Sequence, residues 1–172
     1  ASCNFLSGCR IDVDDIGRRL HERDVLFSLD AIQSLGAFPL SVEHVDFLSA
    51  DSHKWLLGPS GAGIFYVKRS RMEVLQPAML GALNVVSPEY IAQDEIRFYS
   101  GARRYEPGTL HVPGIVGMAA SMELLLEVGI EAVSRRILEL RRAFLDRVRP
   151  LGYRLLVDDD DDTTDGERSG II

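Results

Sequence analysis

The stretch that decides the fold is VDFLSADSHKW, residues 45–55. Its first six residues form a short, mostly apolar run, which is typical of a strand buried in a parallel sheet. The run VLFSL at 25–29 has the same character, and IFYV at 64–67 is a third. A helix with one apolar side is expected over 12–23. Strands and helices at this spacing predict an α/β fold.

The chain after these strands is expected to be a long loop followed by two helices. Residues 77–108 show little periodicity, and a loop of that length is usually functional or covers an interface. A proline near the start and Gly129 just past the end bound a helix over 113–128. Apolar side chains at helical spacing predict a second helix over 130–149, whose arginines we expect on a solvated face, among them Arg135, Arg136, Arg141 and Arg142.

Three shorter segments also resemble strands. They are residues 4–6, which look like the end of a strand, residues 153–157, and the apolar run that starts at 169.

Composition excludes several classes of protein. The chain has 172 residues, 46% of them hydrophobic, and a formal net charge of −7. Most of the excess negative charge lies in 158–172, where the aspartate run 158–162 is expected to be a solvated loop, because the ligand spacing and central glycine of an EF-hand are missing. We therefore expect no metal site. No basic stripe for nucleic acid is present, and no apolar run approaches the roughly 20 residues of a membrane span.

The two cysteines, Cys3 and Cys9, are too few for a disulfide framework and favour a reducing compartment. The N-terminus has no basic region of the signal-peptide type. The sequence therefore predicts a cytoplasmic protein.

The candidate chemistry follows the ends of two predicted strands. Functional groups of α/β sheets gather at the carboxyl ends of strands, where Asp30 and Lys54 are expected. A desolvated lysine amine can form a Schiff base, and an aspartate can keep the pyridine nitrogen of pyridoxal phosphate (PLP) protonated. Gln33 could donate to the phenolic oxygen of the ring, and Ser52 and His53 could meet its phosphate. The plainer alternatives are a surface lysine and an aspartate that caps a strand-end turn.

These motifs resemble the class V aminotransferases of fold type I. The resemblance rests on DAIQSLG at 30–36, SHKWLLGPSG at 52–61, GIFYV at 63–67, RRYEPGT at 103–109 and ERSGII at 167–172. The similar branch is that of the cysteine desulfurases, selenocysteine lyases and isopenicillin-N-epimerase-like proteins.

The resemblance implies the fold and its division into parts. The expected architecture is part of the PLP-binding large domain, a mostly parallel sheet flanked by helices, followed by the start of a small domain. The large domain would end at residue 128, a connecting helix would span 129–150, and the small domain would begin in 151–172.

The resemblance also implies roles for individual residues. Lys54 would form the Schiff base and move protons at the substrate α-carbon, with His53 beside the phosphate or substrate. Asp30 would pair with the pyridine nitrogen and Gln33 with the phenolic oxygen. Thr109 would reach the phosphate in the other subunit of a homodimer.

The chain also departs from the pattern of the family. Desulfurases often have a phosphate-binding serine three residues before the lysine, where this chain has the anion Asp51, and its hydroxyl is one residue later, on Ser52. Direct binding of phosphate by Asp51 is implausible because both groups are negative. Trp55 points toward the epimerase-like branch.

The expected activity is that of a PLP enzyme acting on an amino acid, with C–S lyase or desulfurase chemistry favoured over epimerisation or transamination. The parts of such enzymes that carry the phosphate-binding turn, the substrate arginine and the persulfide cysteine have no counterpart here, so the chain is expected to be the middle of a longer enzyme. The alternative is a truncated α/β scaffold or dimerisation module without catalysis. In either case the apolar stripe of the helix over 130–149 is expected to be partly exposed, which predicts self-association.

Overall fold

A three-stranded sheet in the order β1-β2-β3 lies at the centre of the computed structural model, which describes residues 1–86, 95–156 and 164–172. The strands are β1 (Ser28–Asp30), β2 (Phe47–Asp51) and β3 (Gly63–Val67). β1 and β2 pair in parallel, with Asp30 opposite Ser49, whereas β3 pairs with β2 antiparallel. The expected parallel pairing therefore holds for one pair only. The 11-residue connection from β2 to β3 has no helix, and a parallel crossover needs a dozen or more residues.

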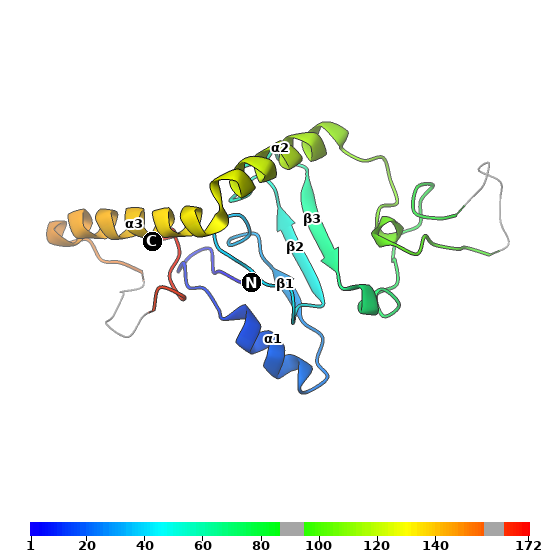
Figure 1. Ribbon diagram of the computed structural model, residues 1–172, viewed down its shortest axis with the longest axis horizontal. Helices are drawn as coiled ribbons and strands as arrows, with labels where there is room; N and C mark the ends of the chain where they lie inside the picture. The colour runs from blue at the N-terminus through cyan, green and yellow to red at the C-terminus, as the bar shows by residue number, and fades with distance from the viewer. Residues whose placement is uncertain (87–94, 157–163) are drawn as a thin grey trace.

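Three α-helices accompany the sheet (Figure 1). They are α1 (Val13–His21), α2 (Val112–Val128) and α3 (Ile130–Val148). In Figure 1, α1 lies below the sheet, α2 lies above it, and α3 extends to the left. Asp12 caps α1 by accepting a hydrogen bond from the Asp15 amide, as predicted for the start of that helix. Short 3-10 turns occur at η1 (Arg69–Arg71), η3 (Ala102–Tyr105) and η4 (Arg149–Leu151).

The core lies on one face of the sheet. Leu29, Leu48 and Ala50 are buried there, and one side of α1 packs against them. Apart from the buried Phe47, the side chains that alternate with them are exposed on the opposite face. They include Ser28, Asp30, Ser49, Asp51 and Phe65. The candidate residues Asp30 and Asp51 therefore belong to the open face of the sheet.

A buried carboxylate ties the sheet to its neighbours. Asp46 is fully buried and accepts hydrogen bonds from the Phe27 amide and from Arg71 Nε, both at 2.8 Å. His21 Nε2 lies 3.4 Å from the same carboxylate. Burial alone would raise the pKa of Asp46, but these partners outweigh burial and hold the pKa below its ordinary value.

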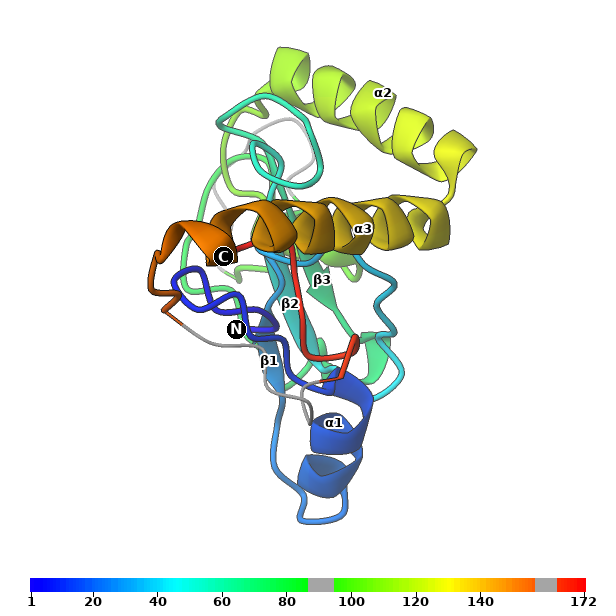
Figure 2. The same ribbon diagram turned by 90° about the vertical axis from the view of Figure 1, so that its left-hand side faces the viewer.

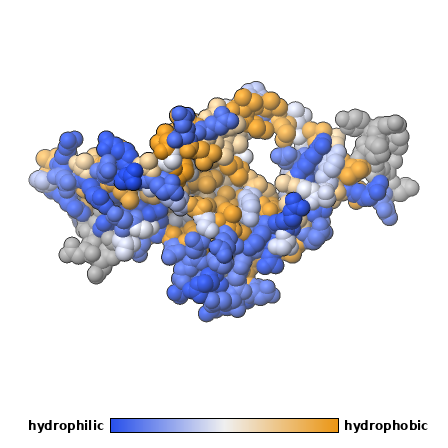
Figure 3. Space-filling model, viewed as in Figure 1, coloured by the Kyte–Doolittle hydropathy of each residue, from blue (hydrophilic) through white to orange (hydrophobic). Residues whose placement is uncertain are grey.

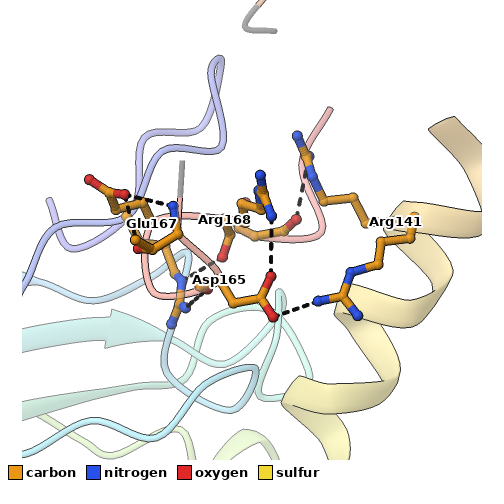
Figure 4. Close-up of polar contacts among 8 residues, drawn as sticks. Arg141, Asp165, Glu167 and Arg168 are labelled. Carbon is orange, nitrogen blue, oxygen red and sulfur yellow. Dashed lines mark hydrogen bonds and ion pairs between the residues drawn. The ribbon is translucent and has the colours of Figure 1, made fainter. Parts of the chain in front are cut away.

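The chain end folds back onto the N-terminal segment (Figure 2). The backbone amide of Arg10 donates to the Glu167 carbonyl at 2.9 Å, and its side chain donates to the carbonyls of Arg168 and Asp165 at 2.6 and 2.7 Å. Arg141 of α3 is buried and donates to the Ile171 carbonyl at 2.7 Å. Figure 4 shows this chain end beside α3.

Several of the predicted segments differ from the structure. Residues 5–7 form a turn, and the only pairing there is an isolated bridge between Cys3 and Arg10. β1 begins only at Ser28, three residues later than the predicted run 25–29. Val25 and Leu26, which precede it, are exposed. Residues 153–156 and 169–172 form no strand.

The predicted solvated face of α3 is wrong at Arg141, because the returning chain end covers it. The aspartate run 158–162 lies outside the described residues. Both cysteines are free thiols; Cys3 is buried and Cys9 exposed. No helix among the described residues has the length and apolar character needed to cross a bilayer.

Candidate active site

The structure brings the turn that follows β1 against the turn that follows β2. Because β1 and β2 are parallel, both turns leave the sheet at the same edge. The Trp55 indole Nε1–H donates to Gln33 Oε1 at 3.3 Å, which joins the two turns directly. Gly36 makes the approach possible, because its φ is +93° and a Cβ on it would lie 2.5 Å from the Trp55 carbonyl oxygen.

Lys54 lies in a tightly bonded loop. The Gly58 amide donates to the Ser52 carbonyl at 2.8 Å, and the Leu57 amide donates to the Lys54 carbonyl at 3.1 Å. Leu57 has a φ of +58°, which is unusual for a branched side chain and frequent near functional sites. The Lys54 side chain is half-buried. The loop therefore fixes the backbone of Lys54 beside the Gln33 turn.

The Ser52 side chain is already engaged within this loop. It is fully buried, and its hydroxyl donates to the Pro59 carbonyl. A serine hydroxyl has a single proton to donate. The observed bond therefore uses that proton to shape the loop around Lys54.

Asp30 ends β1 on the open face of the sheet. Its Oδ1 accepts a hydrogen bond from the Ile32 amide at 3.0 Å, which is the strand-end turn expected as the plainer alternative. Its second carboxylate oxygen has no hydrogen-bond partner within the described part of the chain, so the turn leaves it available. A hollow of about 370 Å³ opens beside Asp30, with Asp51, Gly63 and Phe65 along its wall.

His53 stands at the exposed side of the Lys54 loop. Its Nδ1 lies 3.8 Å from Asp51 Oδ2, and both side chains are substantially exposed. Such an exposed pair contributes little to stability. The His53 imidazole comes directly before Lys54 in the sequence, and the Asp51 carboxylate stands at the end of β2.

Thr109 is exposed and comes three residues before α2. The beginning of α2 packs on the turn that follows Lys54: a Cβ on Gly61 would lie 3.5 Å from His111 Cδ2, and one on Gly117 would lie 2.9 Å from Pro59 Cγ. The segment of Thr109 therefore lies near the Lys54 loop of its own chain. No hydrogen bond joins Thr109 to the candidate residues within the described ranges.

The bond between Trp55 and Gln33 is the part of the site that sequence reasoning missed. A signal was present, because Trp55 follows Lys54 directly and carries one hydrogen-bond donor, while Gln33 lies in the other candidate turn. Their contact depends on the packing of two turns, which no periodicity encodes.

Comparisons with known proteins agree with this architecture. The family model "Aminotransferase class-V" matches residues 2–168. A cysteine desulfurase IscS from Anaeromyxobacter dehalogenans is 38% identical over 132 residues, which cover 75% of this chain and 28% of the relative. A probable cysteine desulfurase from Methanothermobacter thermautotrophicus is 32% identical over 126 residues, covering 72% of this chain and 31% of the relative. The chain thus spans about a third of the length of these curated relatives.

Solved structures show the same fold. Apo cysteine desulfurase from Thermococcus onnurineus NA1 superposes with a TM-score of 0.76 at 24% identity, over 86% of this chain and 37% of that one. The cysteine desulfurase CsdA from Escherichia coli gives the same score, identity and coverage. The expected fold, part of the large domain of a fold type I PLP enzyme, is confirmed by these neighbours. With a family model that matches nearly its whole length, the chain belongs to the aminotransferase class-V family.

Proposed function

We propose that this chain forms part of a PLP-dependent enzyme that acts on an amino acid by C–S lyase chemistry of the cysteine desulfurase type. The observation that carries the proposal is the meeting of the Asp30–Gln33 turn with the Lys54 loop through the Trp55–Gln33 bond. The relatives named as cysteine desulfurases support C–S bond cleavage over the alternatives, epimerisation or transamination.

The residues present fit this cofactor. Asp30 keeps one carboxylate oxygen at the hollow without a partner among the described residues, and that oxygen suits a protonated ring nitrogen. Gln33 spends its carbonyl oxygen on Trp55, so its NH₂ group remains to donate to a phenolic oxygen. Lys54 supplies the amine for covalent attachment. When bound, PLP supplies an electron sink that stabilises negative charge at the substrate α-carbon.

Each residue then has a defined task. Asp30 holds the proton on the ring nitrogen, because a carboxylate partner favours the charged form of that base. Lys54 would take and return the proton at the substrate α-carbon. His53 lies beside the phosphate or the substrate, with Asp51 3.8 Å from its Nδ1. Ser52 shapes the loop through Pro59, and as a phosphate ligand it would donate its hydroxyl proton to the phosphate in place of that carbonyl, because phosphate oxygens are acceptors.

The protein is further proposed to be a cytoplasmic homodimer in which Thr109 reaches the phosphate in the neighbouring subunit. Support comes from α2, which follows Thr109 and exposes large apolar side chains, among them Val116, Leu124 and Leu126. Figure 3 shows an apolar area over this helix. A helix that is apolar all round is normally buried. We propose that a second copy of the chain packs against α2 and buries these side chains. The division at residues 128 and 150 into large domain, connecting helix and small domain is proposed on the same family resemblance.

The test uses the two lysines of the chain, Lys54 and Lys68. The full-length protein is incubated with PLP, reduced with borohydride, digested and analysed by mass spectrometry. We expect the pyridoxyl label on Lys54, and its loss in Lys54→Ala. Lys68→Ala is the matched control, because Lys68 Nζ already donates to the Glu43 carbonyl at 2.7 Å, and this variant should keep the label.

Product analysis separates the reactions. Sulfide and alanine from cysteine would support the desulfurase activity, whereas a racemised or transaminated product would favour one of the alternatives. A folded protein that takes up no PLP would overturn the proposal and leave the non-catalytic scaffold.

A further inference from the structure

Trp55 is the only tryptophan of the chain, and it follows the candidate Schiff-base lysine directly. We propose that Trp55 is a positioning residue that fixes the orientation of the Gln33 amide, so that Gln33 presents its NH₂ group to the cofactor. The inference rests on the proposed function, because it concerns how Gln33 meets the phenolic oxygen of PLP. It assigns a task to a side chain outside the Asp, Gln and Lys constellation.

The chemistry of the two groups sets the orientation. An indole has one N–H donor and no acceptor, so its partner must be an acceptor. A glutamine amide has an acceptor oxygen and a donor NH₂ group. Trp55 Nε1 lies 3.3 Å from Gln33 Oε1, which directs the NH₂ group of Gln33 away from the indole. Among the described residues no acceptor takes a hydrogen bond from this NH₂ group.

Trp55 is held at its ring edge and at its backbone. A Cβ placed on Gly170 would lie 3.0 Å from Trp55 Cη2, so the chain end contacts the far edge of the ring. Gly36 packs against the Trp55 backbone carbonyl. The ring also borders a hollow of about 710 Å³ that it shares with Leu140 and Phe144 of α3, so the contact with Gly170 and the bond to Gln33 are what fix the direction of its N–H.

The orientation of the amide matters because the phenolic oxygen of the bound cofactor carries negative charge. An N–H donated to that oxygen stabilises its ionised form and lowers the pH at which the chromophore titrates. A reversed amide would place its carbonyl oxygen against the same charge. Trp55 therefore acts on the cofactor through Gln33.

The first readout does not involve the cofactor. In the PLP-free, full-length protein labelled with ¹⁵N, the indole N–H of residue 55 can be followed by NMR. Gln33→Met removes the acceptor while keeping a side chain of similar length. We expect the indole resonance to shift upfield in Gln33→Met and to stay in place in Ile32→Val, a conservative change at the neighbouring position. An unmoved resonance in Gln33→Met would overturn the inference.

The second readout is the pH titration of the bound cofactor's absorbance. Gln33→Met should raise its midpoint by about one pH unit, since a hydrogen bond to a charged group is lost. Trp55→Phe keeps a ring but removes the N–H, and should raise the midpoint by about half a unit, because the freed amide samples both orientations. In the Gln33→Met background Trp55→Phe should add nothing, which is the coupling that a double-mutant cycle detects.

The outcomes separate this inference from the proposed function. Additive shifts, or an unchanged midpoint in a Trp55→Phe protein that binds PLP, would show that Trp55 does not act through Gln33. A wild-type protein without PLP uptake would instead overturn the proposed function, and the indole resonance alone would then decide whether Trp55 holds the Gln33 amide. Gly170→Ala, which crowds the far edge of the ring, should shift the same resonance without touching Gln33.

Discussion

At the residue scale, the candidate groups were predictable because each stands at a strand end or in a family motif. Asp30 and Lys54 follow apolar runs, and the structure places both at the same edge of the sheet. The burial and the hydrogen-bond partners of individual side chains were not predictable. The buried bond from Ser52 to Pro59 depends on the path of a whole loop, and the burial of Arg141 depends on a chain end 30 residues away.

The clearest prediction at this scale concerns Asp46. Asp46→Asn should lower the free energy of unfolding by about 2–3 kcal/mol, because it removes the negative charge that faces Arg71 and leaves that guanidinium near the core without its partner. Urea denaturation at pH 7 measures the loss. Asp15→Asn is the control, because Asp15 pairs with arginines on the exposed surface of α1, and the change there should be much smaller.

The pH dependence of the Asp46 contribution has a defined sign. Its pKa in the folded protein is below the ordinary value of 3.8, so its stabilising contribution is fully present above that value. The contribution is lost as the pH falls through the lowered folded-state pKa. The difference between the wild type and Asp46→Asn should therefore shrink below about pH 4. A difference that stays constant down to pH 2 would contradict this assignment.

At the scale of elements, helices could be located closely and strand pairing could not. The predicted helix over 113–128 is α2 at 112–128, since a proline and a glycine mark its ends. The antiparallel pairing of β3 was missed, because apolar content reports burial and not direction. The strand predicted over 153–157 is absent from its described part, 153–156, for the same reason: Tyr153 and Leu156 are apolar but exposed and unpaired in the sheet.

The meeting of the two turns at the site leads to a prediction about Gly36. Gly36→Ala should lower the free energy of unfolding by about 2–4 kcal/mol, because the new methyl group would strain a left-handed backbone and collide with the Trp55 carbonyl. Gly152→Ala is a matched control: its φ of +80° and ψ of +13° are left-handed, and a Cβ added there would meet no other atom within 4 Å. It should cost only about 1 kcal/mol.

Denaturation followed by the fluorescence of Trp55 measures both variants. The fluorescence of folded Gly36→Ala should also differ from the wild type, since the indole next to the clash must move, whereas that of Gly152→Ala should not. Equal losses of stability in the two variants would mean that the turns do not press on each other.

At the scale of the whole molecule, α2 is rich in apolar side chains, and many of them are exposed to solvent. Residues 112–122 contain no charged side chain, and Val116 is 63% exposed. From the sequence, self-association was predicted through the apolar stripe of α3, and Leu140 and Phe144 of that helix are exposed. α2 presents more apolar surface, and it begins beside the turn that follows Lys54, so contact with a second copy there would bring Thr109 of one chain toward the site of the other.

The final prediction follows from that surface. Val116→Asp should raise the dissociation constant of the dimer at least 10-fold, because a carboxylate at the centre of an apolar interface must be desolvated without a partner. Sedimentation velocity over a range of concentrations measures the constant. Val74→Asp is the control, since Val74 is similarly exposed at 57% but lies just after η1, away from α2. A wild type that stays monomeric, or equal effects of the two substitutions, would exclude α2 as the interface and would remove the route by which Thr109 could serve a neighbouring subunit.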